Sequence, residues 1–532
     1  MNFVSIDFIV FILGLFLIYF VVPKKIQWIV LLIGSYTFFY LTSAKLIVFA
    51  IITSMVSFIS GIVLNRINHV TTEYLAANKK DMSKDEKKLY KKRQARKKKW
   101  IVAFAVIINL GILVVLKYGA FIGGNLNSVL EIFGLHINVP NLNYLLPIGI
   151  SFYTLQSIGY VVDMYRNKYE ADKNFFKFSL FMTYFPQIIQ GPIARYDQLA
   201  KQLYEGHSFD YSRVTQGAQL ILWGFMKKLL VADRLSIMVN EIFNNYTEYE
   251  GIIYLIAGIA YGMQVYCDFS GGMDIARGVS QIFGIELSLN FERPYFAKSI
   301  SEFWRRWHIS LGSWMRDYIF YPLSLSKFFG TLSKFTRKIL GNYIGKKLPT
   351  FLSMFIVFLL VGVWHGSSWK YVVYGLWNGI IIVTSILLDP YYDKWLKKLN
   401  IKTDCFSWGF FQMLRTFFLC SLGRLFPRAG SCTIAIDMFT GIFKKFNPWV
   451  LFDGTIFSLG LDLSDFVILG IMVIILLAVG ILQERGMHIR ETIAQQNLYF
   501  RWVVYLGAIA FLVVYGVYGP GYSATEFIYK QF

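Results

Sequence analysis

The chain has 532 residues, of which 56% are hydrophobic and 18% aromatic, and its formal net charge is +21. Its mean hydropathy of +0.49 reflects many separate apolar runs near twenty residues long. A soluble domain cannot bury so many such runs, so the composition indicates an integral membrane protein. The four cysteines form no C-x-x-C pair and the six histidines no H-E-x-x-H motif, so we expect no metal site. P-loop, G-x-S-x-G and G-x-G-x-x-G motifs are missing too, and with them the usual signals for NTPases, serine hydrolases and dinucleotide-binding enzymes.

Apolar segments recur along the chain and predict an all-α polytopic membrane protein. Residues 3–22 have no basic region before them and no small-residue cleavage site after them, so we expect a retained first span rather than a signal peptide. The other predicted spans are residues 26–41, 46–64, 100–118, 144–164, 176–189, 216–231, 252–268, 352–363, 369–388, 406–425, 466–483 and 502–517. With partial or re-entrant pieces at residues 275–283 and in the helix around Ser301, the count is about 11 to 13 helices. Connections are short and no repeat is visible, which predicts a single domain over residues 1–532.

One basic segment determines the predicted orientation. Residues 79–99 contain twelve Lys or Arg against three acidic residues, a net charge of +9. A basic loop beside membrane spans is typical of the cytoplasmic side, so we expect no nucleic-acid partner. Counting back from a cytoplasmic loop places Lys24 and Lys25 inside as well, and the N-terminus outside.

The most unusual segment is residues 299–321, SISEFWRRWHISLGSWMRDYIFY. Ser299 and Glu302 have the S-x-x-E spacing of a capping box, so a helix is expected to start there. Trp304, Trp307 and Trp314 recur at helical spacing, which predicts one aromatic stripe. A lipid-facing span could not hold the six titratable groups of this segment, because each central charge costs roughly +2.5 to +3.5 kcal/mol. The segment therefore either faces a bundle interior or wet cavity, or lies as an amphipathic helix on the membrane surface.

A second unusual stretch is VGVWHGSSW at residues 361–369. The preceding apolar run, residues 352–363, gives only about 18 Å of helix, short of a core roughly 30 Å thick. We therefore expect His365 below the membrane surface, at a break in the backbone that only protein or a watery cavity tolerates. The alternative is a histidine that hydrogen-bonds a nearby carbonyl at a helix end.

Two histidines in unusual membrane segments point to acyl transfer. An imidazole with a pKa of about 6.5 can take a proton from a hydroxyl nucleophile and return it to a leaving group. Neither ATP nor a metal is required if the acyl donor is already a thioester. Gln264 and Asp268, one helical turn apart in an apolar run, are expected to line a tunnel or to play a structural role.

Six motifs resemble the membrane-bound O-acyltransferase family, most closely its bacterial branch that holds the membrane subunit of alginate O-acetylation. They are LPIGISFYTLQSIGYVVDMYR (146–166), FPQIIQGPIAR (185–195), QVYCDFSGGMDIARG (264–278), FWRRWHISLGSWMRDYIFYPL (303–323), VWHG (363–366) and FIYKQF (527–532). The resemblance implies a ring of tilted helices around a trans-membrane reaction tunnel. It also implies that His365 is catalytic and that His308 lies in the same tunnel.

The resemblance makes residues 299–366 the expected catalytic core segment. Residues expected to contact substrate in it or near it are Trp304, Arg305, Ser310, Asp317, Gln264, Asp268 and Trp364. Two departures concern the donor or partner. Residues 323–325 are Leu-Ser-Leu where the family often has Leu-Gly-Gly, followed by a basic insert at residues 326–348, and Lys530 stands where an aromatic residue is usual.

The expected function is passage of an acyl group, most simply acetyl, from a cytoplasmic thioester to a hydroxyl of an extracellular or cell-wall polysaccharide, or of a partner protein that modifies it. The donor would be acetyl-CoA or an acyl-carrier thioester, with no permanently bound cofactor. Expected partners are the lipid membrane, the acceptor polymer, and an SGNH-type acetyltransferase or an acyl carrier protein. The expected location is the bacterial plasma (inner) membrane. Two rivals remain: D-alanyl transfer from a carrier protein to teichoic acid, and, in a different class, a polysaccharide or small-molecule transporter.

Overall fold

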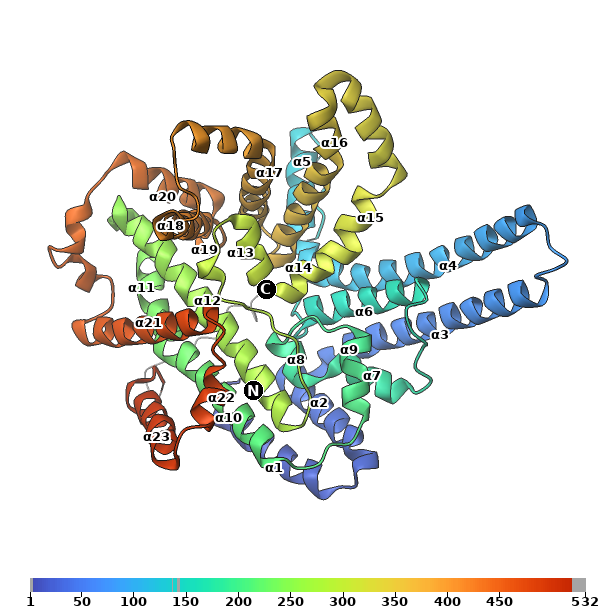
Figure 1. The fold of residues 1–532 in the computed structure, drawn as a ribbon, viewed down its shortest axis with the longest axis horizontal. Helices are drawn as coiled ribbons and strands as arrows, with labels where there is room; N and C mark the ends of the chain where they lie inside the picture. The colour runs from blue at the N-terminus through green and yellow to red at the C-terminus, as the bar shows by residue number, and fades with distance from the viewer. Residues whose placement is uncertain (1–2, 136, 141–143, 519–532) are drawn as a thin grey trace. The chain divides into compact units, whose positions relative to one another are not determined.

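The computed structural model describes residues 3–135, 137–140 and 144–518. The closing motif at residues 527–532, with Lys530, lies outside the described residues. Within them the secondary structure is helical and contains no strand, apart from one isolated bridge between Phe291 and Trp307 (Figure 1). The predicted all-α class is confirmed.

The chain divides into two compact units. Unit 1 comprises Met1–Gly217 with Val279–Ser288, and unit 2 comprises Ala218–Gly278 with Leu289–Phe532. The chain passes from one unit to the other inside α10 (Tyr211–Phe225) and α12 (Ile252–Ile282). The organisation of residues 1–532 as a single domain stays a prediction.

Seven helical stretches of the described chain are long and apolar enough to cross a membrane, as expected for a multi-pass membrane protein. They are Lys24–Ala77, Lys84–Ile132, Ile252–Ile282, Lys327–His365, Trp369–Lys398, Leu463–Glu484 and Leu498–Tyr515. The first stretch contains two of the predicted spans, which a short turn separates. Their arrangement as a ring around a tunnel stays a prediction.

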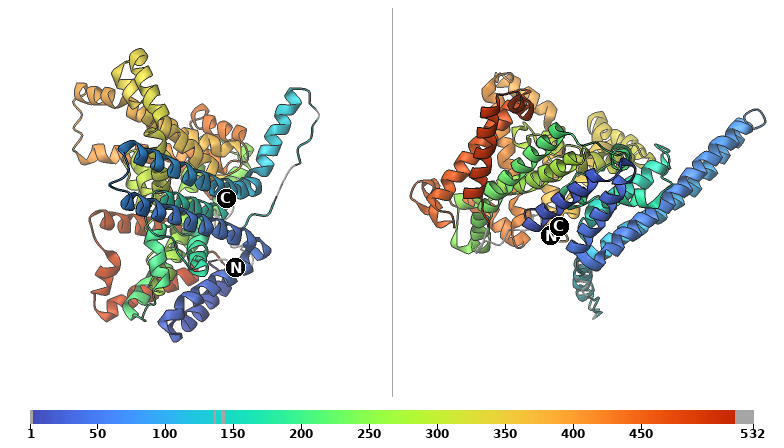
Figure 2. Two further views of the ribbon diagram at one scale, coloured as in Figure 1. Left: turned by 90° about the vertical axis from the view of Figure 1, so that its right-hand side faces the viewer. Right: turned by 90° about the horizontal axis from the view of Figure 1, so that it is seen from below.

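Unit 1 is built on the packing of α3, α4 and α6. Its helices are α1 (Ile6–Val21), α2 (Gln27–Ser43), α3 (Ile47–Ala77), α4 (Lys84–Leu113), α5 (Gly119–Ile132), α6 (Ile150–Tyr165), α7 (Phe175–Thr183), α8 (Phe185–Gln190) and α9 (Tyr196–Tyr204). α3 and α4 run side by side as a long pair (Figure 2). A buried hydroxyl and amide cluster joins the three helices, since Ser157 Oγ lies 2.6 Å from Ser57 Oγ and accepts from Asn109 Nδ2 at 2.7 Å.

The predicted basic loop at residues 79–99 is largely wrong as a loop. α4 begins at Lys84, where Ser83 and Glu86 form a capping box, and continues through the basic residues into the apolar run. Lys and Arg are good helix formers, so a capped basic segment has no reason to unwind. Residues 84–99 therefore extend the helix by about 24 Å.

Unit 2 contains the C-terminal part of α10, most of α12, and all later helices. These are α11 (Asp233–Asn244), α13 (Ile300–Arg306), α14 (Ile309–Met315), α15 (Tyr321–Ser324), α16 (Lys327–His365), α17 (Trp369–Lys398), α18 (Phe406–Gly423), α19 (Leu425–Arg428), α20 (Cys432–Lys444), α21 (Leu463–Glu484), α22 (Ile489–Ala494) and α23 (Leu498–Tyr515).

Short 3-10 and π segments connect or interrupt the helices of both units. The 3-10 segments are η1 (Lys24–Ile26), η2 (Ala44–Leu46), η5 (Tyr246–Glu248), η6 (Pro294–Phe296), η8 (Pro448–Leu451) and η9 (Thr455–Ser458). The π segments are η3 (Val114–Tyr118), η4 (Met226–Ala232) and η7 (Arg316–Phe320).

The predicted separate piece at residues 275–283 is wrong, because α12 runs without a break from Ile252 to Ile282. Gly271 does not interrupt it. A Cβ on Gly271 would lie 2.8 Å from the Gly224 carbonyl oxygen of α10, so the glycine serves a close helix crossing rather than a turn.

α16 and α17 form the hairpin that carries VWHG. The predicted short helix at residues 352–363 is wrong in length: α16 starts at Lys327 and ends at His365, and a kink at Gly341, whose φ is +78°, divides it into two helical parts. The length of this helix therefore no longer supports a position of His365 below the membrane surface. The predicted break after His365 is confirmed. α17 starts four residues later, at Trp369.

Glycines allow the two arms of this hairpin to touch. A Cβ on Gly375 of α17 would lie 3.0 Å from the Gly362 Cα of α16. A Cβ on Gly366, in the turn itself, would lie only 2.1 Å from a carbon of the Tyr371 ring. The turn therefore closes over Tyr371 only because residue 366 has no side chain.

We expect Gly366→Ala to lower the free energy of unfolding by about 1–3 kcal/mol, since the added methyl must displace the Tyr371 ring. The measurement is the thermal unfolding midpoint of the purified protein in detergent. Gly470→Ala in α21 is the matched control, because a Cβ there meets open space and should leave the midpoint unchanged or slightly higher. Equal midpoints for the two variants would contradict the steric role of Gly366.

Candidate functional site

Residues 299–321 form two short helices instead of the single predicted one. α13 starts as predicted, where the Ser299 hydroxyl accepts a hydrogen bond from the Glu302 amide at 3.1 Å. The prediction of one continuous aromatic stripe is wrong. The helix is interrupted at His308, whose φ of +48° lies in the left-handed region. Pairing with the preceding segment replaces helix bonds at the break: Ile309 N donates to the Asn290 carbonyl at 3.0 Å.

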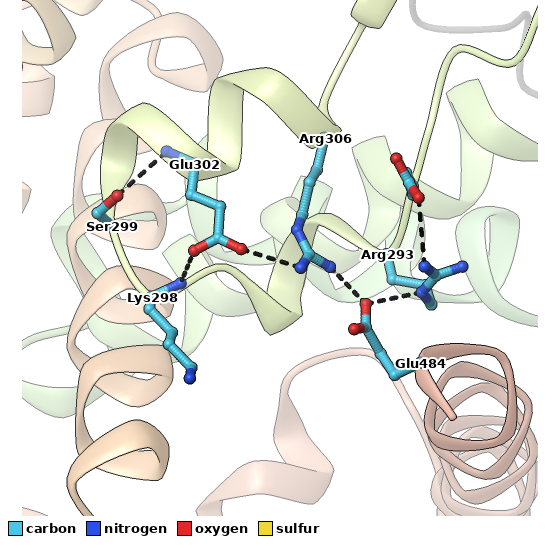
Figure 3. Close-up of polar contacts among 7 residues, drawn as sticks. Arg293, Lys298, Ser299, Glu302, Arg306 and Glu484 are labelled. Carbon is cyan, nitrogen blue, oxygen red and sulfur yellow. Dashed lines mark hydrogen bonds and ion pairs between the residues drawn. The ribbon is translucent and has the colours of Figure 1, made fainter. Parts of the chain in front are cut away.

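Charged residues of this segment hold α13 in place (Figure 3). Glu302 accepts from the Lys298 backbone N at 2.9 Å and forms an ion pair with Arg306, also at 2.9 Å. Arg306 and Arg293 both pair with Glu484, the last residue of α21. Part of the unusual charge in this segment is therefore structural, and it ties α13 to α21.

His308 is fully buried, and its Nδ1 atom lies against the Asn290 amide, 3.2 Å from Nδ2 and 3.3 Å from Oδ1. The same Oδ1 atom accepts a hydrogen bond from the Ser310 backbone N at 2.8 Å. Asn290 therefore holds both the His308 ring and the start of α14.

Trp364 brings His365 and His308 together. The centroid of its ring lies 5.5 Å from that of His308 and 5.0 Å from that of His365. His365 is the last residue of α16, and its ring lies 6.1 Å from the Tyr374 ring of α17. Both predicted catalytic histidines therefore contact the same indole, one from a backbone break and one from a helix end.

His365 lines a small cavity of unit 2 that is partly open to solvent. Other lining side chains come from four further elements: Tyr261 of α12, Trp307, Tyr371 and Tyr374 of α17, and Arg424 after α18. An imidazole, phenol hydroxyls and a guanidinium thus meet around this cavity.

The residues predicted to contact substrate in the 299–321 segment have other neighbours. Trp304 Nε1 donates to Asn378 Oδ1 of α17 at 3.0 Å, and Asp317 lies 3.2 Å from Arg316 in η7. Ser310 is buried and bonded to Asn290, whereas Arg305 is exposed. These four and Trp364 are not among the described side chains that line the cavity, so their role in substrate binding stays a prediction.

Gln264 and Asp268 both lie on the buried side of α12, one turn apart. Asp268 Oδ1 lies 2.7 Å from Lys228 Nζ, which also lies 2.8 Å from Asp233 Oδ1, and all three side chains are at most 4% exposed. A buried charge of this kind is stable only with its partner, so the pairing accounts for Asp268 without a substrate. The buried Oε1 atom of Gln264 has no hydrogen-bond partner among the described residues.

Arg424, Tyr261, Tyr371 and Tyr374 were not singled out from the sequence. For Arg424 a signal existed, because a cation inside the predicted span at residues 406–425 is itself a functional indication. The tyrosines offered none, since aromatic residues are common throughout this chain. No group of three or more His, Cys, Asp or Glu that could hold a metal ion occurs among the described residues.

Comparison with known proteins gives a family match. Residues 167–337 match the sequence model of MBOAT, the membrane-bound O-acyltransferase family. This range includes His308 and ends before His365.

Relatives match a longer part of the chain. A probable alginate O-acetylase of Pseudomonas syringae pv. tomato is 33% identical over 353 residues, which cover 66% of this chain and 62% of that protein. The peptidoglycan O-acetyltransferase of Helicobacter pylori is 29% identical over 375 residues, 65% of each chain. The teichoic acid D-alanyltransferase of Streptococcus thermophilus is 27% identical over 263 residues, 48% of this chain and 58% of the relative.

The chain thus spans less than two thirds of the length of these relatives. Within that span the family domain, the alginate O-acetylase relatives and the all-helical fold agree with one another. The chain belongs to the membrane-bound O-acyltransferase family.

Proposed function

We propose that the protein is a membrane O-acyltransferase that passes an acyl group, most simply acetyl, from a cytoplasmic thioester to a hydroxyl acceptor outside the membrane. The acceptor would be an extracellular or cell-wall polysaccharide, or a partner protein that modifies it. The observation that carries the proposal is His365, which stands at a helix end on the wall of a cavity and contacts the same indole as His308.

In the proposed reaction His365 acts as the general base. It removes the proton of the acceptor hydroxyl as the oxygen attacks the thioester carbonyl, and it returns that proton to the departing thiolate. A thioester is already activated, so the donor would be acetyl-CoA or an acyl-carrier thioester, and no resident cofactor takes part.

His308 has a different proposed role. Its ring is fully buried against the Asn290 amide, and it does not belong to the cavity lining that includes His365. A histidine in this place can orient the neighbouring groups, whereas the acceptor hydroxyl would meet His365 first. We therefore assign His308 to positioning and His365 to proton transfer.

Two reactions are candidates, acetyl transfer and D-alanyl transfer, because relatives of both kinds match the chain. They differ in the acyl donor and in the acceptor. We favour acetyl transfer, since the alginate O-acetylase relatives are the more identical and cover more of the chain. An SGNH-type acetyltransferase is then the proposed partner, whereas an acyl carrier protein would be the partner of a D-alanyltransferase. A transporter would give the paired histidines no role.

His365→Gln should lower acyl transfer by about 10²- to 10⁴-fold, because glutamine keeps a hydrogen bond but cannot move a proton. The measurement is release of free thiol from acetyl-CoA and from a carrier thioester, with purified protein of unchanged unfolding midpoint. The two donors also separate acetylation from D-alanylation.

The matched comparison is the double variant His365→Ala with His308→Ala. Its rate of acyl transfer should be little lower than that of His365→Ala alone. When two residues act in the same step, removing either one already removes most of their joint contribution to the rate. Near wild-type transfer by a folded His365→Gln variant would contradict the assignment of the base.

The basic insert at residues 326–348 is proposed to attract the acidic donor. Lys334, Arg337 and Lys338 are exposed on the first part of α16. Reversing all three to Glu should raise the apparent KM for the donor several-fold and weaken its dependence on salt, because the local concentration of the anionic donor falls.

The control for this charge reversal is the same change at Lys394, Lys397 and Lys398, which are exposed at the end of α17. Only the α16 variant should alter donor KM. If neither set changes it, the insert instead attracts lipid headgroups.

We further propose the bacterial plasma membrane as the location, with the N-terminus external and residues 79–99 cytoplasmic. In a variant without its four cysteines, a cysteine at Lys80 should resist a membrane-impermeant thiol reagent in intact cells, and one at Ser128 should react. Both positions are exposed, so accessibility depends on the side of the membrane. The reverse labelling pattern would contradict the topology.

A further inference from the structure

The proposed mechanism leaves one group on the cavity wall unused, the guanidinium of Arg424. Arg424 follows the last residue of α18, and only 3% of it is exposed. It lines the same cavity as His365. A buried cation beside a proposed base needs a physical account.

The known partners of Arg424 are all neutral. Its Nη1 donates to the Gly262 carbonyl at 2.8 Å and to the Tyr295 hydroxyl. Its carbon Cζ lies 4.5 Å from the centroid of the Trp307 ring, an arrangement in which the ring face attracts the cation. No carboxylate forms an ion pair with Arg424 in the part of the chain that the structure describes.

The approach of Arg424 to α12 is built into the sequence. A Cβ on residue 262 would lie 2.8 Å from Nη1, so Gly262 leaves the space that the guanidinium occupies. The Tyr374 side chain, on the same wall of the cavity, is a further polar neighbour of the guanidinium. The guanidinium is thus held against the cavity wall by neutral groups.

Two more cations nearby also have neutral partners. Arg428 Nη2 donates to Asn240 Oδ1 at 2.6 Å, and Lys370 Nζ donates to the Ala429 carbonyl at 2.8 Å. Buried Lys228 shows the contrast, since it lies between two carboxylates. The surroundings of the cavity thus carry positive charge that the described residues do not neutralise by ion pairs, and this favours negative charge inside it.

We propose that Arg424 is a catalytic residue that stabilises the negative charge on the acyl carbonyl oxygen during transfer. This inference rests on the proposed acyl transfer. As the hydroxyl oxygen bonds to the carbonyl carbon, the π electron pair moves to the carbonyl oxygen and His365 takes the hydroxyl proton. The oxyanion then re-forms the C=O bond, the C–S bond breaks, and the thiolate takes the proton from His365.

A cation aimed at this oxygen acts mainly in the transition state, because the carbonyl is neutral in the ground state. Arg424→Gln should therefore lower kcat by about 10²- to 10³-fold and change donor KM by less than about 3-fold. Arg424→Lys retains a cation but not the fork, so we expect a loss of about 10-fold. If the Gln variant does not fold, the Lys variant carries the test.

A structural role would not produce the same pattern of binding. The probe is a thioether analogue of the donor, in which a CH₂ group replaces the carbonyl, so that no oxyanion can form. Its dissociation constant should be the same for the wild type and for both Arg424 variants. Weaker analogue binding in proportion to the loss of kcat/KM would overturn the proposal and make Arg424 a positioning residue.

Arg428→Gln is the control, since Arg428 is a neighbouring, partly exposed arginine that does not line the cavity. It should leave kcat within about 3-fold of the wild type. An equal loss in the Arg428 variant, or a folded Arg424→Gln variant with near wild-type kcat, would overturn the assignment. The proposed function has its own test: an active His365→Gln variant would contradict it, whatever the activity of the Arg424 variants.

Discussion

The turn between α16 and α17 depends on a single steric condition, the missing side chain at Gly366. Because the Tyr371 ring fills the space that a Cβ would need, the turn can close tightly only with glycine there. The same turn ends α16 at His365 and directs Tyr371 and Tyr374 of α17 to the cavity wall. The proposed base and two of its neighbours are therefore positioned by one backbone contact.

Unit 2 buries charge in two physically different ways. Lys228 is neutralised by Asp268 and Asp233, which makes that group a self-contained element of the helix packing. Arg424 is instead solvated by a carbonyl, a phenol and an aromatic face, which reduce the cost of burial without cancelling the charge. The first arrangement suits structure, and the second retains a field that a reacting group can use.

Long-range contacts explain where local patterns predicted the wrong element. The aromatic residues around Trp307 recur with a helical period, yet hydrogen bonds to Asn290 accompany an interruption of the helix at His308. The helix at residues 352–363 was expected to be short, but it already begins just after a kink at Gly341, and a second, basic helical part of α16 precedes that kink. In each case the partner lies far along the chain or the polar residues are themselves helix formers, and hydropathy records neither.

By itself, the sequence determined the all-helical membrane class, the helix start at Ser299, the break after His365 and the family, because composition, caps and motifs are local. Only the tertiary structure decided that Trp364 contacts both His308 and His365, and that Asp268 already has a basic partner. Only it joined Arg424 to the His365 cavity. The physical reason is that the burial and neutralisation of a charge depend on neighbours brought by other helices, which no spacing along the chain encodes.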